Sequence, residues 1–123
     1  MASILIVDDE EMIREELSEA LEFEEFDVTT AASAIEALKI CDETSFDVIV
    51  TDLKMPKMGG LDFLRALREN ETKALVFVVS GHGAKSNEVE AVNLGAVACL
   101  SKPLDVDHLI EKINISHENN YKI

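Results

Sequence analysis

Basic residues are scarce in this sequence of 123 residues, and their scarcity excludes two classes of partner. The 11 lysines and arginines stand against 25 aspartates and glutamates, which leaves a formal net charge of −14. Proteins that bind nucleic acids draw most of their affinity from basic side chains that neutralise phosphates, so direct binding to DNA or RNA is not expected. The same negative charge disfavours docking on anionic membranes.

Long hydrophobic runs and cysteines are also few. The first apolar run, Ser3 to Val7, follows no basic leader, and no stretch approaches the roughly 18 apolar residues of a membrane-spanning helix. We therefore expect no signal peptide, no membrane insertion and a cytoplasmic location. Cys41 and Cys99 both lie in apolar contexts, which is typical of small buried thiols in a reducing compartment.

The sequence does contain enough hydrophobic residues to form a core. They make up 47% of the chain, which argues against a disordered acidic segment. A chain of this length is typical of one domain and buries roughly 70% of its unfolded surface without disulfides or structural metal. We predict a single domain over residues 1–123, with its core over residues 3–116 and a frayed polar tail over residues 117–123.

Short apolar runs alternate with amphipathic helical patterns along the whole chain. The runs predict strands over residues 3–7, 27–30, 46–51, 74–79 and 96–101. Helices are predicted over residues 11–22, 61–68 and 88–94, from Ser33, which has capping-box spacing to Glu36, and from Asp105. Strict alternation with right-handed crossovers predicts an α/β fold, a doubly wound parallel sheet of five strands with helices on both faces.

Polar residues that follow these strands predict a site at one edge of the sheet. Asp8 and Asp9 follow the first strand, and Asp52, Ser80 and Lys102 follow the third, fourth and fifth. Ligand sites in such sheets lie beyond the carboxyl ends of the strands. Carboxylates that converge there repel one another unless a divalent cation binds, and an all-oxygen ligand set suits Mg²⁺ better than zinc. A carboxylate nucleophile beside a lysine and a hydroxyl suits phosphoryl transfer through an acyl phosphate.

Three motifs carry a family resemblance. Ile6-Val7-Asp8-Asp9-Glu10, the run from Thr51-Asp52 to Gly59-Gly60, and Leu100-Ser101-Lys102-Pro103 resemble the receiver domain of bacterial two-component response regulators. The resemblance covers residues 3 to about 116, in the order and spacing of the family. It implies a flavodoxin-like three-layer sandwich with strand order 2-1-3-4-5.

The resemblance also implies roles for the acidic residues. Asp52 matches the phosphoacceptor, which takes a phosphoryl group from a phosphohistidine of a sensor histidine kinase or a histidine phosphotransfer protein. Asp9 matches a direct ligand of Mg²⁺, for which Mn²⁺ could substitute, and Asp8 matches a neighbour that acts through metal-bound water. Asp52 and the backbone carbonyl of Lys54 complete the implied metal ligands.

Further positions match the groups that contact the phosphoryl group. Ser80 matches the switch hydroxyl that follows the phosphoryl group, and Lys102 matches the lysine that pairs with it. Pro103 matches the residue after the cis peptide bond of the family. The domain is therefore expected to catalyse only its own phosphorylation and dephosphorylation, and to change its binding to a downstream effector protein.

Four positions modify this expectation. Cys99 stands where the family usually has an aromatic switch residue, so coupling is predicted to run through the Ser80 loop and the helix over residues 84–94. Gly59 stands where the family commonly has aspartate, which is expected to alter loop stiffness. Lys54 and His82 match positions that flank the approach of hydrolytic water, and the lysine predicts a phosphoryl lifetime of minutes or longer. His82 is otherwise read as an ordinary exposed histidine.

Several alternatives remain open from the sequence. The chain could be a docking module that acts without phosphorylation, or a receiver fragment of a longer regulator with an output domain. A Mg²⁺-dependent phosphatase is disfavoured because Lys54 occupies the position of its second acid. The dense acidic residues of the first helix are either a solvated face or a surface for a basic partner. A monomer or a weak homodimer is expected.

Overall fold

The computed structural model describes residues 2–81 and 85–121 and contains alternating strands and helices. The strands are β1 (Ser3–Val7), β2 (Asp27–Ala31), β3 (Val48–Asp52), β4 (Leu75–Ser80) and β5 (Ala98–Ser101). The helices are α1 (Glu11–Phe23), α2 (Ala34–Glu43), α3 (Gly60–Glu69), α4 (Lys85–Asn93) and α5 (Val106–Tyr121).

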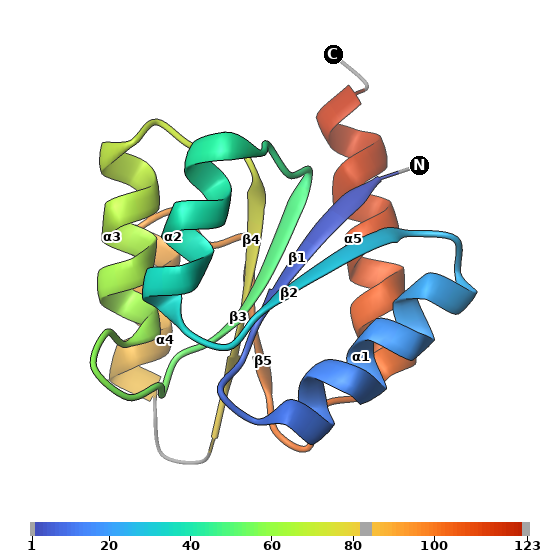
Figure 1. Ribbon diagram of the computed structural model, residues 1–123, viewed down its shortest axis with the longest axis horizontal. Helices are drawn as coiled ribbons and strands as arrows, with labels where there is room; N and C mark the ends of the chain where they lie inside the picture. The colour runs from blue at the N-terminus through green and yellow to red at the C-terminus, as the bar shows by residue number, and fades with distance from the viewer. Residues whose placement is uncertain (1, 82–84, 122–123) are drawn as a thin grey trace.

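The strands form one parallel sheet in the order β2-β1-β3-β4-β5. Helices α1 and α5 cover one face, and α2, α3 and α4 cover the other, so that the molecule has three layers (Figure 1). The predicted doubly wound α/β fold and its strand order are therefore confirmed. Because every strand runs in the same direction, all the carboxyl ends lie at one edge of the sheet.

Alternation along the strands divides the hydrophobic core into two clusters. On β1, Leu5 and Val7 pack toward α2, α3 and α4, whereas Ile4 and Ile6 pack toward α1 and α5. These residues are 0–1% exposed, as expected for strands that are covered on both faces. The continuous apolar runs of the sequence thus reflect burial on both sides of the sheet.

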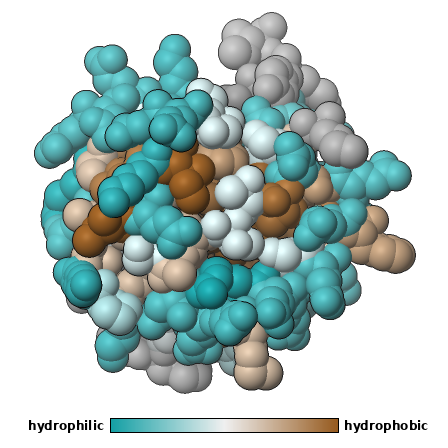
Figure 2. Space-filling model, in the orientation of Figure 1, coloured by the Kyte–Doolittle hydropathy of each residue, from teal (hydrophilic) through white to brown (hydrophobic). Residues whose placement is uncertain are grey.

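The outer face of α1 is acidic and exposed. Leu17 and Leu21 of this helix are buried against the sheet. Figure 2 shows that hydrophilic side chains cover much of the molecular surface in this view. Exposed glutamates of the helix are Glu11, Glu15, Glu16, Glu19 and Glu22. This arrangement agrees with the interpretation of a solvated face, and it leaves the alternative of a basic partner surface untested.

Several predicted boundaries are wrong by a few residues. Strand β3 covers Val48–Asp52 rather than residues 46–51, so Asp52 is the last residue of the strand and pairs with Val79 in the ladder. Likewise Ser80 and Ser101 close the ladder between β4 and β5. Helix α4 begins at Lys85, three residues earlier than the apolar pattern predicted. Helix α5 continues through residues 117–121, part of the predicted frayed tail, since neither glycine nor proline interrupts it.

Gly60 begins α3 directly against the backbone of β3. A Cβ atom at this position would lie 2.5 Å from the carbonyl oxygen of Asp52 and 2.7 Å from the Cα atom of Leu53. The Gly60 amide donates a hydrogen bond of 2.8 Å to the Leu53 carbonyl, which fixes this close approach. Glycine is therefore needed for packing α3 beneath the carboxyl end of β3.

We expect Gly60→Ala to lower the free energy of unfolding by about 1–3 kcal/mol, because the added methyl group overpacks the contact with Asp52 and Leu53. Helix propensity alone predicts the opposite sign, a gain of up to about 1 kcal/mol. Urea denaturation monitored by circular dichroism distinguishes the two effects. Gly81→Ala is the matched control, since a Cβ atom there would meet nothing within 4 Å. A Gly60→Ala variant as stable as wild type would contradict the prediction.

Candidate functional site

Three carboxylates meet at the carboxyl edge of the sheet. Asp8 and Asp9 follow β1, Asp52 ends β3, and one carboxylate oxygen of each lies within 4.8 Å of the others. The side chain of Asp9 is exposed, whereas Asp8 and Asp52 are each 5% exposed. This is the cluster that the sequence predicted, and its oxygen ligands suit a hard divalent cation that is reached from the exposed side.

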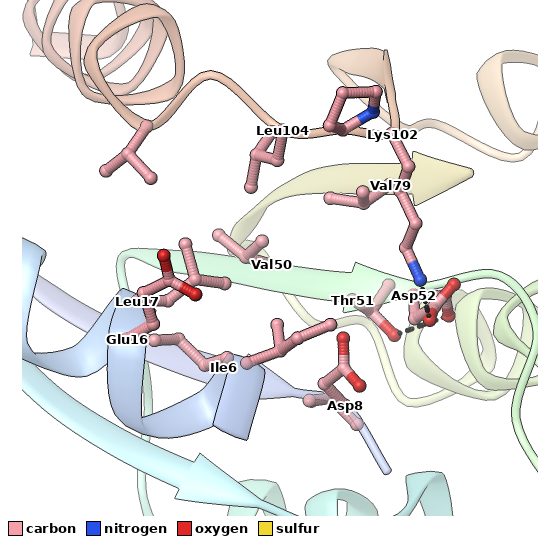
Figure 3. Close-up of a pocket in the computed structure, with 14 residues that line it drawn as sticks. Ile6, Asp8, Glu16, Leu17, Val50, Thr51, Asp52, Val79, Lys102 and Leu104 are labelled. Atoms are coloured by element: carbon pink, nitrogen blue, oxygen red, sulfur yellow. Dashed lines mark hydrogen bonds and ion pairs between the residues drawn. The ribbon is translucent and has the colours of Figure 1, made fainter. Parts of the chain in front are cut away.

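The carboxylate of Asp52 is oriented by two hydrogen-bond donors. The Lys102 ammonium lies 2.8 Å from Oδ2, and the backbone amide of Lys54 lies 3.1 Å from Oδ1. Figure 3 shows the Lys102 side chain extending from its strand end to Asp52. The hydrogen bond with Asp52 raises the pKa of Lys102, so the lysine carries its charge at neutral pH. The sequence predicted the lysine but did not anticipate the Lys54 amide bond.

The environment of Asp8 disfavours its charged form. Burial raises the pKa of Asp8 above its ordinary value of 3.8, and repulsion by Asp52 adds to the rise. The backbone amide of Glu10, 2.9 Å from Oδ1 of Asp8, partly opposes this shift. Arg14 donates a hydrogen bond of 2.8 Å to the carbonyl of Asp8, which fastens the loop to α1. A bound cation would relieve the repulsion between these carboxylates.

Ser80 lies at the predicted strand end, but its hydroxyl is directed to an unpredicted partner. The side chain is 1% exposed, and its Oγ donates a hydrogen bond of 2.9 Å to Oε1 of Glu88 on α4. Glu88 is not among the site residues predicted from the sequence. Its only signal is an acidic residue near the start of a helix, which is common on solvated helices.

Cys99 contacts the same segment of α4. Its Sγ lies 3.6 Å from the backbone carbonyl oxygen of Glu88, and the side chain is half-buried. Burial raises the pKa of the Cys99 thiol, with a further contribution from the charge of Glu88. The thiol is therefore a small, weakly reactive group that packs against α4. His82, which was predicted to influence the phosphoryl lifetime, lies outside the described residues.

The loop after β5 closes the site from the side of α5. The Lys102–Pro103 peptide bond is cis, as the resemblance implies. The amide of Lys102 donates a hydrogen bond of 2.8 Å to the carbonyl of Ser80, which joins the ends of β4 and β5.

Gly59 precedes α3 and gives it no side-chain cap. Lys54 is exposed, in keeping with its expected position at the mouth of the site.

An apolar cavity adjoins the charged groups. It has a volume of about 280 Å³ and extends beneath α1 and the loop before α5, beside Asp8, Asp52 and Lys102 (Figure 3). Its apolar walls include Ile6, Leu17, Val50, Val79 and Leu104. The carboxylates therefore have apolar walls on one side, which strengthens their interactions with charges.

Comparison with known proteins assigns this arrangement to a family. The family model described as the response regulator receiver domain matches residues 4–114, which include all three carboxylates and Lys102. The chain belongs to the response regulator receiver domain family. Residues Asp8, Asp9, Asp52 and Lys102 thus stand in a receiver domain of the two-component type.

Solved receiver domains share the fold over nearly the whole chain. A receiver domain protein of Clostridium thermocellum is 36% identical, with a TM-score of 0.92 over 98% of this chain and 97% of that chain. A CheY-like receiver domain protein of Methanospirillum hungatei JF-1 is 32% identical, with a TM-score of 0.94 over 99% and 98% of the two chains. These values confirm the predicted family and architecture.

The curated relatives are longer than this receiver domain. The transcriptional regulatory protein FixJ of Rhizobium meliloti is 36% identical over 117 residues, which are 95% of this chain and 57% of that protein. Across three such relatives, the chain spans 23%, 49% and 57% of their lengths. Within the described residues, no helix is both long and apolar enough to cross a membrane.

Proposed function

We propose that this receiver domain is a phosphorylation switch in which Asp52 is the acceptor. The observation that carries the proposal is the position of the Asp52 carboxylate, held 2.8 Å from the Lys102 ammonium beside the acidic cluster. A carboxylate oxygen of Asp52 forms an O–P bond while the N–P bond of a phosphohistidine breaks. The imidazole leaves with the electron pair of that bond.

The acidic cluster fits the Mg²⁺ ion that such a transfer uses. Asp9, Asp52 and the Lys54 carbonyl are the proposed ligands, with Asp8 beside them, and Mn²⁺ could substitute. A bound cation would supply positive charge for the phosphoryl oxygens. Lys102 supplies a further positive charge beside Oδ2 of Asp52, and the Lys54 amide keeps the acceptor oriented.

The donor and the output are inferred from the family. We infer that a sensor histidine kinase or a histidine phosphotransfer protein supplies the phosphoryl group in the cytoplasm. Phosphorylation adds close to two negative charges and strong acceptor oxygens to a buried site. The resulting change is expected to alter binding to an effector, either a separate protein or an output domain such as those of longer regulators.

The test is phosphoryl incorporation measured by intact-protein mass spectrometry. With acetyl phosphate and Mg²⁺, wild type should gain the mass of one phosphoryl group, and chelation of Mg²⁺ should prevent the gain. Asp52→Asn should abolish it, because the amide oxygen is not a nucleophile of comparable strength. Asp62→Asn is the matched control, as Asp62 is exposed on α3 and pairs with Arg65. A wild type that gains no phosphoryl group would favour a docking module that acts without phosphorylation.

A further inference from the structure

The hydrogen bond between Ser80 and Glu88 joins the proposed switch hydroxyl to α4. It is 2.9 Å long and spans from the end of β4 to the side chain of a residue in the first half of the helix. The donor is almost fully buried, at 1% exposure. A buried hydroxyl needs an acceptor, and here the acceptor is the side-chain carboxylate of Glu88.

A serine hydroxyl has one proton to donate. It cannot hydrogen-bond fully to Glu88 and to a phosphoryl oxygen on Asp52 at the same time. Asp52 and Ser80 lie on neighbouring strands, since Asp52 pairs with Val79 in the ladder. Glu88 and a phosphoryl group on Asp52 would therefore compete for the same proton.

Glu88 is also connected to β5. The Sγ of Cys99 lies 3.6 Å from the Glu88 carbonyl oxygen, so both the side chain and the backbone of this residue contact the sheet. Two contacts of Glu88 thus join the first half of α4 to the ends of β4 and β5.

The C-terminal half of α4 and the two residues after it contact α3. Arg65 pairs with Glu90, and Arg68 donates hydrogen bonds of 3.1 Å to the carbonyls of both Leu94 and Gly95. These contacts do not involve the ends of the sheet strands. Loss of the contacts at Glu88 would therefore release the first half of α4 while its other end stays attached.

We propose that Glu88 is a positioning residue that holds the Ser80 hydroxyl when Asp52 is unmodified and loses it to the phosphoryl group. The proposal rests on the proposed phosphorylation of Asp52 and adds the acceptor from which Ser80 is withdrawn. Glu88 opposes phosphorylation by competing with the phosphoryl group for the Ser80 proton. The displaced first half of α4 then reports the modification, in place of an aromatic switch residue.

Beryllofluoride binding in the presence of Mg²⁺ tests this competition without a covalent step. We expect Glu88→Ala to raise beryllofluoride affinity about tenfold, measured by ¹⁹F NMR titration, because Ser80 no longer has a competing charged acceptor. Glu88→Gln keeps an acceptor oxygen but removes the charge, so an intermediate affinity is expected. Asn87→Ala is the matched control on the same helix, because Asn87 is exposed, and it should bind as wild type does.

The double-mutant cycle separates competition from a merely structural effect. In a Ser80→Ala background, Glu88→Ala should no longer change the affinity. An equal gain in both backgrounds, or no gain in either, overturns the role of Glu88 while leaving the wild-type affinity and the proposed function intact. Absence of beryllofluoride binding by wild type overturns both.

Alkylation of Cys99 reports the release of α4 directly. In a Cys41→Ser background, iodoacetamide should modify Cys99 several-fold faster when beryllofluoride and Mg²⁺ are bound, because the Glu88 backbone moves away from the thiol. Mg²⁺ alone should leave the rate unchanged. An unchanged rate with beryllofluoride bound would contradict the release of the helix.

Discussion

Replacing Lys102 with methionine is expected to slow the phosphorylation of Asp52 by about 10²–10³-fold. The Lys102 ammonium lies 2.8 Å from Oδ2 of Asp52, where it neutralises charge on the phosphoryl oxygens as the O–P bond forms. Methionine preserves an unbranched apolar side chain but removes this charge. The measurement is the initial rate of phosphoryl incorporation from acetyl phosphate at saturating Mg²⁺, followed by intact mass.

The control for this substitution is Lys73→Met. Lys73 is exposed and precedes β4 at the opposite end of the sheet from Asp52, so its removal changes the net charge equally without touching the site. This variant should react at the wild-type rate. A Lys102→Met variant that reacts within a few-fold of wild type, while retaining a folded circular dichroism spectrum, would show that the lysine is not part of the transfer.

The second large effect concerns the acidic cluster and Mg²⁺. Burial holds the pKa of Asp8 above 3.8, so the folded state binds this proton more tightly than the unfolded state. In chelator, the free energy of unfolding should therefore fall as the pH rises from 3.8 through the folded-state pKa of Asp8. Asp8→Asn should remove this contribution and be more stable than wild type at neutral pH without metal.

Added Mg²⁺ should make wild type more stable than Asp8→Asn. At a concentration 100 times its dissociation constant, it should stabilise wild type by about 2.7 kcal/mol, because it binds the folded carboxylates. The gain should fade on acidification as Asp8 takes up its proton. Asp8→Asn should gain less from Mg²⁺, whereas Asp62→Asn, outside the cluster, should respond as wild type does. Equal stabilisation of all three by Mg²⁺, measured by thermal unfolding, would exclude the cluster as the binding site.

The sequence by itself determined the architecture because the signals involved are local. Ser3–Val7 is a continuous apolar run whose alternate residues fill both core clusters, as a strand covered on two faces requires. Ser33 accepts a hydrogen bond of 3.1 Å from the Glu36 amide, as the capping-box spacing predicted. The order of strands and helices then brings their polar ends to one edge through the handedness of the crossovers.

The sequence also determined which residues gather at that edge. Asp8, Asp9, Asp52 and Lys102 meet because parallel strands bring their carboxyl ends together, whatever fills the core. The predicted boundaries of helices and strands are less accurate, and the pattern that predicts α4 is the weakest. Its residues have little apolar periodicity, since exposed Val89 and Val92 do not form a stripe with its buried residue Ala91.

Only the tertiary structure decided which atoms face one another. Ser80 and Glu88 are separated by eight residues and a loop, so no helical or strand period predicts their hydrogen bond. The need for glycine at position 60 arises from the approach of its Cα to the Asp52 carbonyl, which depends on how α3 packs under β3. Periodicity specifies the face of an element, but the partner of a buried hydroxyl depends on the packing of neighbouring elements in space.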